Sequence, residues 1–168
     1  MRRRHTIGML VEDQPGVMTR VAGLFARRGY NIDTITVGKT TKLGISKMII
    51  TVLGDDDILE QIEKQCNKLI DVIKVSELGK DDSIITELCL IKVALPNDKA
   101  KNDIIKYSEI YKTKIVDITP KSAILQIIGD TKKIDSFIEL MKKYGIREVS
   151  RTGITAITRG PKVIGDKK

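Results

Sequence analysis

Apolar residues recur along the chain with two spacings, and the first third of the sequence shows both. A short apolar run at residues 5–11 precedes a segment in which Val17, Val21, Leu24 and Phe25 return every three or four residues, as on one face of a helix. Two further runs, 32–37 and 45–53, flank the polar loop GKTTKLG. The pattern predicts a strand, an amphipathic helix ended by Gly29, and a hairpin.

A second helix and a fourth strand complete this part of the chain. Three aspartates at 55–57 suit the positive end of a helix dipole, and the apolar residues that follow share a face: Ile58, Ile62, Cys66 and Leu69. Residues 72–78 supply the next strand. The order strand, helix, strand, strand, helix, strand is that of the ferredoxin-like fold, so residues 1–79 are predicted to form one domain.

The same order begins again after the polar break at 79–83. Strands are predicted at 84–95, 114–118, 123–128 and 146–158, and helices at 97–112 and around 134–141. The first of these helices sets Ala100, Ile104, Tyr107 and Tyr111 on one face. We therefore expect an α+β protein of two ferredoxin-like βαββαβ modules, the second formed by residues 80–168.

The charge of the chain changes this picture little. A net charge of +8 suggests a nucleic-acid partner, but residues 1–79 hold 12 basic and 10 acidic side chains and the remainder 18 and 12. Only 4% of residues are aromatic, whereas an RNA-binding sheet of this topology needs exposed aromatic side chains. The excess is interpreted as solvated surface, and neither a nucleic acid nor a membrane is expected as a partner.

Cysteines and apolar runs indicate a cytoplasmic protein. Cys66 and Cys89 have no close Cys or His partner, so they are expected to be buried apolar residues rather than parts of a disulfide or zinc site. No apolar run has membrane length, and the start, MRRRHTIGMLVEDQPG, is too short in apolar residues for a signal peptide.

No catalytic constellation is evident. His5 stands at a strand start, no Ser or Cys nucleophile has a base close in sequence, and the glycines match neither a phosphate loop nor a dinucleotide fingerprint. An enzyme that works through carboxylates stays an alternative, but we predict no catalytic residue and no metal site in this chain.

The stretch VEDQPGVMTRVAGLFARRGYNID is the one candidate site. Pro15 fits the first turn of a helix, and Gly16 removes the side chain that would block approach to the backbone N–H groups. Such groups bind small anions, and the carboxylate of an amino acid is one, while Asp13 or Asn31 suits its ammonium. This predicts an amino-acid sensor. The alternative is a helix stabilised by its own capping, with Asn31 as a turn residue.

Motifs along both modules resemble one family, the small or regulatory subunit of acetolactate synthase (acetohydroxyacid synthase). The resemblance covers Arg2 to about Gly160 and rests on EDQPGVMTRVAGLFARRGYNIDTITVG, LEQIEKQCNKLIDVIKVSEL, ELCLIKVAL, KIVDITPKSAILQIIG and GIREVSRTGITAITRG. It implies that residues 1–79 are an ACT domain, that two chains pair through these domains, and that effector sites lie at their interface.

The resemblance also implies residues for that site. The backbone around Gly16, Val17 and Met18 would receive the effector's carboxylate, Thr19 stands where the family has a small hydroxyl residue, and Asn31 and Ile32 would come from the second chain. Asp13 departs from the family, which commonly has Asn there, and a carboxylate pairs with the ammonium but repels the carboxylate.

The resemblance implies a partner and an effector as well. The chain would activate a catalytic large subunit, which carries thiamine diphosphate, magnesium and FAD, and would hold no cofactor itself. Valine is the expected feedback inhibitor, although valine, leucine and isoleucine differ too little for the sequence to rank them. Arg147, Arg151 and Arg159 are interpreted as surface or structural residues, with a contact to the large subunit as the alternative. The rival function is a free-standing ACT-type sensor or transcriptional regulator.

Overall fold

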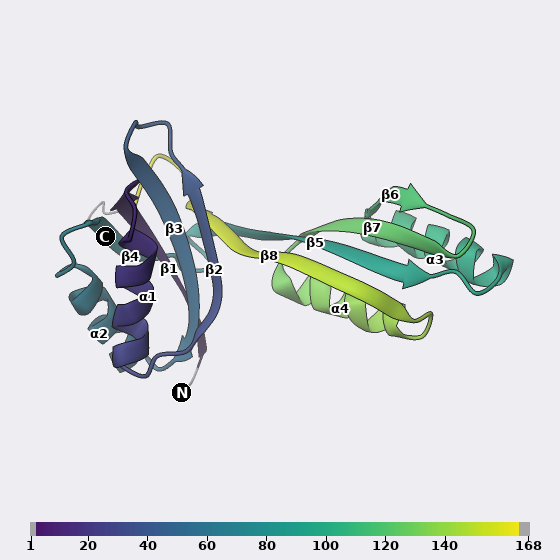
Figure 1. Ribbon diagram of the computed structural model, residues 1–168, viewed down its shortest axis with the longest axis horizontal. Helices are drawn as coiled ribbons and strands as arrows, with labels where there is room; N and C mark the ends of the chain where they lie inside the picture. The colour runs from purple at the N-terminus through teal and green to yellow at the C-terminus, as the bar shows by residue number, and fades with distance from the viewer. Residues whose placement is uncertain (1–2, 165–168) are drawn as a thin grey trace. The chain divides into compact units, whose positions relative to one another are not determined.

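A computed structural model describes residues 3–164, which form two compact units, each built on a four-stranded sheet (Figure 1). Of the described residues, one unit comprises 3–85 and 154–164, and the other comprises 86–153. The elements are β1 (Arg3–Glu12), α1 (Val17–Arg27), β2 (Ile32–Lys39), β3 (Ile45–Gly54), α2 (Asp56–Cys66), β4 (Val72–Glu77), β5 (Ser83–Ala94), α3 (Asp98–Tyr111), β6 (Lys114–Ile118), β7 (Ser122–Gly129), α4 (Thr131–Lys142) and β8 (Ile146–Thr158).

Both halves of the chain have the predicted βαββαβ order. The sheet orders are β2-β3-β1-β4 and β6-β7-β5-β8, so the second sheet repeats the topology of the first. In the first sheet, β1 pairs antiparallel with both β3 and β4, and β2 pairs antiparallel with β3. The predicted α+β class with two ferredoxin-like modules is confirmed.

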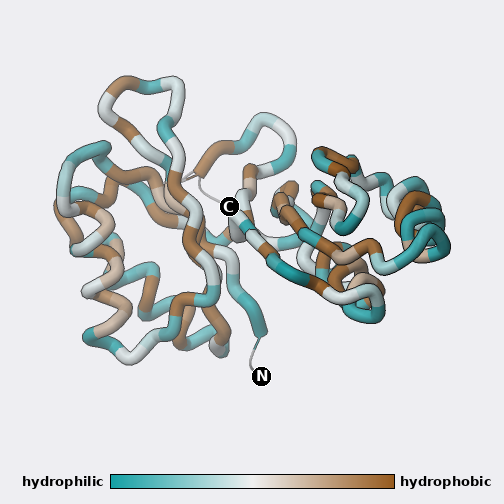
Figure 2. The backbone as a smooth tube through the Cα atoms, turned by 45° about the vertical axis from the view of Figure 1, so that its right-hand side comes forward, coloured by the Kyte–Doolittle hydropathy of each residue, from teal (hydrophilic) through white to brown (hydrophobic). Residues whose placement is uncertain are grey.

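The first core lies between the sheet and its two helices. Val21 and Phe25 of α1 and Ile62 of α2 pack against buried residues of the strands, which include Ile7, Met9, Met48, Ile50 and Val52. Figure 2 shows hydrophobic stretches along the strands and helices of this unit, interrupted by hydrophilic ones. Two details differ from the predicted buried face of the second helix. Leu59 is buried, whereas the predicted Ile58 is half-buried, and the predicted Leu69 is only partly buried against the cluster.

The opposite face of the first sheet is covered by the end of the chain. Ile154, Ala156 and Ile164 form a second buried cluster with Ile49 and Leu78. The hydroxyl of Thr36 donates to the carbonyl of Ile154 at 2.8 Å. The division of the chain thus differs from the predicted boundary at residue 79, because residues 154–164 pack with the first unit.

Gly8 makes room for this second layer. A Cβ atom at position 8 would lie 2.8 Å from Ile164 Cδ1 and 2.9 Å from Leu78 Cδ1. Since real Cβ contacts are longer, the absence of a side chain in the middle of β1 lets the chain end pack closely on the sheet.

The second core has the same plan. Ile104 of α3 and Phe137 and Met141 of α4 pack on Cys89, Ile91 and further strand residues, among them Val93, Ala123, Leu125 and Ile127. The predicted face of α3 is confirmed for Ala100 and Ile104, whereas Tyr107 and Tyr111 are only partly buried. Ser108 is buried instead, with its hydroxyl 2.6 Å from that of Thr113.

Candidate functional site

The turn between β1 and α1 presents an open helix N-terminus. Gly16 is the N-cap residue with φ 88°, and no side chain caps the helix. The N–H of Val17 donates to the carbonyl of Gln14 at 3.4 Å, so the N–H groups that stay available in the first turn are those after Val17. Pro15, predicted for the first turn of the helix, instead precedes the N-cap glycine and lies in the turn before the helix. A left-handed backbone favours glycine, and a Cβ atom here would lie 2.9 Å from Arg20 Nη1.

Arg20 adds a positive charge to this turn. Its Nε and Nη2 atoms donate to the two carboxylate oxygens of Asp71 at 2.5 and 2.7 Å. The hydrogen bond from Arg20 holds the pKa of the Asp71 carboxyl below its ordinary value and raises the pKa of Arg20. Asp71 therefore fixes the guanidinium so that its third nitrogen, Nη1, lies beside Gly16.

Asp13 and the start of α1 lie around the same turn. The N–H group of Asp13 donates to the carbonyl of Gly44 at 2.9 Å, and its carboxylate lies 3.6 Å from Lys39 Nζ. Val17 is buried, whereas Met18 and Thr19 are exposed. One chain thus gathers Asp13, Gly16, Val17 and Met18, with the exposed Thr19 next to them.

The other predicted residues lie elsewhere in the same chain. Asn31, which is exposed, and Ile32, which is half-buried, follow the far end of α1. An eleven-residue helix is about 16 Å long. A ligand the size of an amino acid that touches the Gly16 turn therefore cannot reach Asn31 of the same chain.

The chemistry of the turn suits a carboxylate. Helix N–H groups and the helix dipole attract an anion, and a guanidinium nitrogen strengthens that attraction with a charge-assisted hydrogen bond. The sequence analysis missed Arg20 and Asp71. Arg20 stands four residues after Gly16, on the same side of the helix, which is the one local signal that points to it. Asp71 comes from the start of β4, a contact that no local pattern indicates.

Other groups are tied into the fold. His5 is fully buried, with Nδ1 2.8 Å from Glu77 Oε1. Cys66 and Cys89 are both fully buried, as predicted, and burial raises the pKa of the Cys66 thiol to about 12. Within residues 3–164, no group of three or more His, Cys, Asp or Glu side chains is arranged to hold a metal ion.

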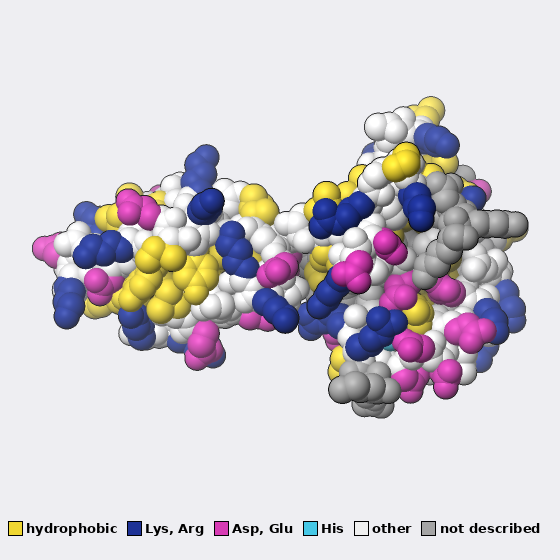
Figure 3. All heavy atoms as spheres, turned by 180° about the vertical axis from the view of Figure 1, so that it is seen from behind, with side chains coloured by type: hydrophobic (Ala, Val, Ile, Leu, Met, Phe, Trp, Pro, Cys, Tyr) yellow, Lys and Arg dark blue, Asp and Glu magenta, His cyan; other side chains and the backbone are white. Residues whose placement is uncertain are grey.

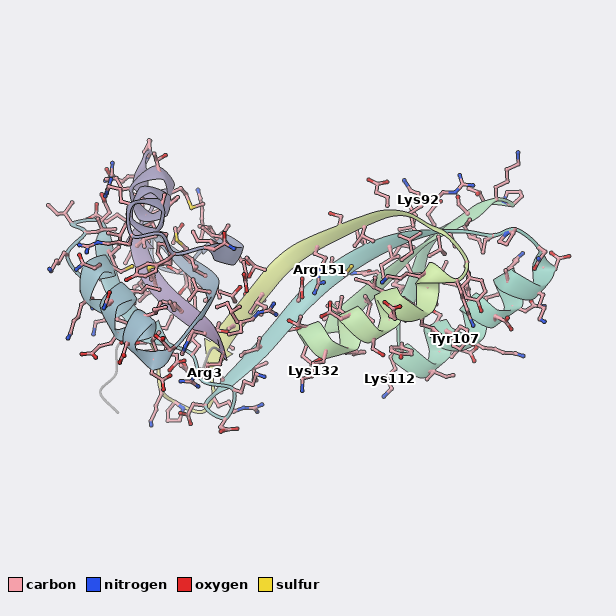
Figure 4. The ribbon with its side chains drawn as sticks, turned by 90° about the horizontal axis from the view of Figure 1, so that it is seen from below. Arg3, Lys92, Tyr107, Lys112, Lys132 and Arg151 are labelled. Carbon is pink, nitrogen blue, oxygen red and sulfur yellow. The ribbon has the colours of Figure 1, made fainter. Side chains whose placement is uncertain are left out.

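On the face seen in Figure 3, Lys and Arg side chains are interspersed with those of Asp and Glu over both units. Arg151, labelled in Figure 4, donates hydrogen bonds to Glu87 and Asp135 of the same unit. None of the helices among the described residues is both long enough and apolar enough to cross a membrane.

Comparisons with known proteins match each half of the chain to its own family model. A family model described as "Small subunit of acetolactate synthase" matches residues 86–160, and one described as "AHAS small subunit-like ACT domain" matches residues 7–74. The probable acetolactate synthase small subunit of Methanothermobacter thermautotrophicus is 49% identical over 160 residues, which cover 95% of each chain. The small subunit of Aquifex aeolicus is 43% identical over 157 residues, 94% of this chain and 82% of that one.

A solved structure supports the same assignment. The crystal structure of the acetolactate synthase small subunit from Thermotoga maritima is 42% identical, superposes with a TM-score of 0.88, and covers 95% of this chain and 99% of that one. The resemblance noted in the sequence is thereby confirmed over nearly the whole chain. This chain belongs to the acetolactate synthase small-subunit family, with an ACT domain in its N-terminal half.

Proposed function

We propose that this chain is the non-catalytic regulatory subunit of acetolactate synthase, which activates a thiamine diphosphate-dependent large subunit and makes it sensitive to a branched-chain amino acid, valine first among them. The observation that carries the proposal is the open N-terminus of α1, with Gly16 and Arg20 Nη1 side by side, inside the segment that matches an ACT domain. Family membership supports a large subunit as the partner, and the geometry of the turn supports an amino acid as the effector.

The effector's carboxylate binds the first-turn N–H groups of α1 and Arg20 Nη1. Its ammonium lies toward Asp13, whose carboxylate is held only loosely, 3.6 Å from Lys39 Nζ. The carboxylate of Asp13, where the family commonly has Asn, strengthens the attraction for the effector's ammonium. It repels the effector's own carboxylate if the ligand shifts toward it. Effector choice therefore depends on Asp13.

Asn31 and Ile32 are supplied by a second copy of the chain. The length of α1 supports this, since one chain keeps these residues far from the Gly16 turn. β2 and β4 are the edge strands of the first sheet, so side-by-side pairing of two such sheets would also satisfy exposed backbone groups. Sedimentation as a monomer at micromolar concentration, with and without valine, would contradict this part of the proposal.

The large subunit supplies the chemistry and its cofactors, thiamine diphosphate, magnesium and FAD, and both subunits act in the cytoplasm. Occupancy by valine must favour one arrangement of the complex over another, because a ligand with equal affinity for both arrangements shifts nothing.

The test is acetolactate formation by the purified large subunit alone, with this chain, and with this chain plus valine. We expect stimulation that valine reverses. Stimulation without a response to valine, leucine or isoleucine would overturn the effector assignment and point to Asp13. No effect on activity would favour the free-standing sensor, and salt-sensitive binding to a defined DNA would favour a transcriptional regulator.

Two substitutions test the site itself. Asn31→Ala removes a polar partner of the ligand, and Gly16→Asp places a carboxylate beside Arg20 Nη1, where the effector's own carboxylate would bind. Both should weaken valine binding in calorimetry, while the exposed Asn102→Ala in α3 serves as the control. Unchanged affinity in both variants, with the fold intact by circular dichroism, would place the site elsewhere.

A further inference from the structure

The first unit contains a cleft that is separate from the proposed effector turn. It has a volume of about 560 Å³ and lies between α2 and β4 on one side and the segment after β8 on the other. Leu59, Val75 and Ile164 contribute apolar surface to it, and the polar lining comes mainly from residues 76–83 and 158–162. None of the residues proposed for the effector site lines this cleft.

Within residues 3–164, one buried polar side-chain atom without a hydrogen-bond partner, Ser83 Oγ, belongs to the lining of this cleft, and a second, His5 Nε2, lies outside the lining, 3.9 Å from Asp56 Oδ1. Ser83 lines the cleft and is 2% exposed, and His5 is fully buried and hydrogen-bonded through its other nitrogen to Glu77, which also lines the cleft. Because leaving a buried polar group unsatisfied is costly, its location beside a cleft indicates a missing polar partner there.

The charge of the lining is acidic, in a chain whose net charge is +8. Four carboxylates, Glu63, Glu77, Asp81 and Asp82, face two cations, Arg159 and Lys162. Glu63 accepts from the N–H of Glu77, and Glu77 Oε1 lies 2.8 Å from His5 Nδ1 and 3.6 Å from Arg3 Nη2. The exposed carboxylates of Asp81 and Asp82 form no ion pair within the described part of the chain and stay available to a ligand.

We propose that this cleft binds a small organic amine, a compound with at least one primary ammonium group on a short hydrocarbon chain. The ammonium pairs with Asp81 and Asp82, and the hydrocarbon packs on Leu59, Val75 and Ile164. The volume is in the ordinary range for small-molecule sites, about 300 to 1,000 Å³. A bare metal ion fits less well, because no group of ligands in residues 3–164 is arranged to hold one.

Such a ligand would hold together two segments of the first unit that are far apart in the sequence. Asp81, Asp82 and Ser83 lie where the chain enters β5, and residues 158–164 follow β8, the strand by which the chain returns. The N–H of Arg159 already donates to the carbonyl of Asp82 at 2.7 Å. An amine that binds both segments therefore stabilises the first unit and the packing of residues 154–164 on its sheet.

The experiment is calorimetric titration of the full chain with 1,4-diaminobutane at low salt, and with 1,4-butanediol as the uncharged analogue of the same length. We expect binding of the diamine and none of the diol. The double substitution Asp81→Asn, Asp82→Asn should lower the affinity by about tenfold or more, since both carboxylates lose a charge-assisted contact. Asp57→Asn, an exposed aspartate of α2 outside the cleft, is the matched control and should bind as the original chain does.

Ser83→Ala provides an independent check. Loss of a hydroxyl that has no partner in the unliganded protein should not lower its melting temperature, but it should weaken diamine binding severalfold. The proposal is overturned if the chain binds diamine and diol alike, if it binds neither, or if the double variant retains the affinity of the Asp57→Asn control.

Discussion

Arg151 forms ion pairs with two carboxylates, more than any other side chain in the described part of the second unit, and it shows what a buried carboxylate requires. It binds both oxygens of Glu87, at 2.7 and 2.8 Å, and Asp135 at 2.7 Å. Glu87 is 2% exposed, so the guanidinium compensates a carboxylate that water cannot reach. The partners of Arg151 raise its pKa, and it stays charged at any pH at which the protein folds.

Replacement of Arg151 by Met should therefore destabilise the second unit by about 3 kcal/mol, because Glu87 is left buried without its cation. The control is Lys92→Met, which breaks an exposed pair with Glu148 and should cost less than about 1 kcal/mol. Urea unfolding followed by tyrosine fluorescence is the measurement, since three of the four tyrosines, Tyr107, Tyr111 and Tyr144, lie in this unit. Equal costs would show that Glu87 finds another partner.

The lowered pKa of Asp71 leads to a prediction about the stability of the protein at low pH. Its pKa in the fold lies below the ordinary value of 3.8 because of the hydrogen bond from Arg20, so its contribution to stability is fully present above about pH 4 and is lost as the pH falls through the lower, folded pKa. Asp71→Asn should be less stable than the original chain at neutral pH, and the difference should shrink below pH 4. Asp57→Asn is the control. A difference that does not change between pH 6 and pH 3 would contradict the assignment.

Single residues also mark how far the sequence could predict the site. Pro15 and Gly16 were evident because turn chemistry is local. Arg20 and Asp71, by contrast, are 51 residues apart, and their pairing depends on β4 lying beside β1. Local patterns could not show that contact, whereas the helix that they predict up to Gly29 already separates Asn31 from the turn.

At the scale of elements, the packing of strand β1 is tightly constrained, because both of its faces are covered. One of its faces packs on the helices, and the other meets the end of the chain, with Gly8 at the closest approach. Gly8→Val should lower the free energy of unfolding by about 1 to 3 kcal/mol, because the new side chain overlaps Ile164 and Leu78.

Gly38→Val is the matched control for this substitution. Gly38 lies on β2, an edge strand, and a Cβ atom there would meet nothing within 4 Å. Valine at this position should be neutral or slightly stabilising, since it removes the flexibility of glycine from a strand. If thermal unfolding shows the same loss for both variants, the close packing of the chain end on β1 is wrong.

The order of elements was predictable because each helix and strand carries its own period of apolar residues. The second layer over the first sheet was not predictable from such periods. Alternation in β3 identifies Met48, Ile50 and Val52 as core residues, yet Ile49 on the opposite face is equally buried. Its cover, Ile154 and Ile164, comes from more than 100 residues further along, and the sequence contains no signal that joins the two.

At the scale of the whole molecule, the two cysteines offer one reporter for each unit. Cys66 lies in the core of the first unit and Cys89 in that of the second. Burial raises the pKa of both thiols, and neither is exposed, so a thiol reagent should label each one only when its unit opens. The labelling rates therefore compare the stability of the two units within one intact chain.

This pair of reporters tests the division of the chain. Ala156 is 5% exposed in the layer over the first sheet, whereas its neighbour Ile157 is 58% exposed. Ala156→Asp buries an unpaired charge and should speed the labelling of Cys66 much more than that of Cys89, while Ile157→Asp should change neither. The labelled peptides are distinguished by mass spectrometry. If Ala156→Asp instead speeds only Cys89, the end of β8 stabilises the second unit, and the layer of Ile154, Ala156 and Ile164 does not belong to the first.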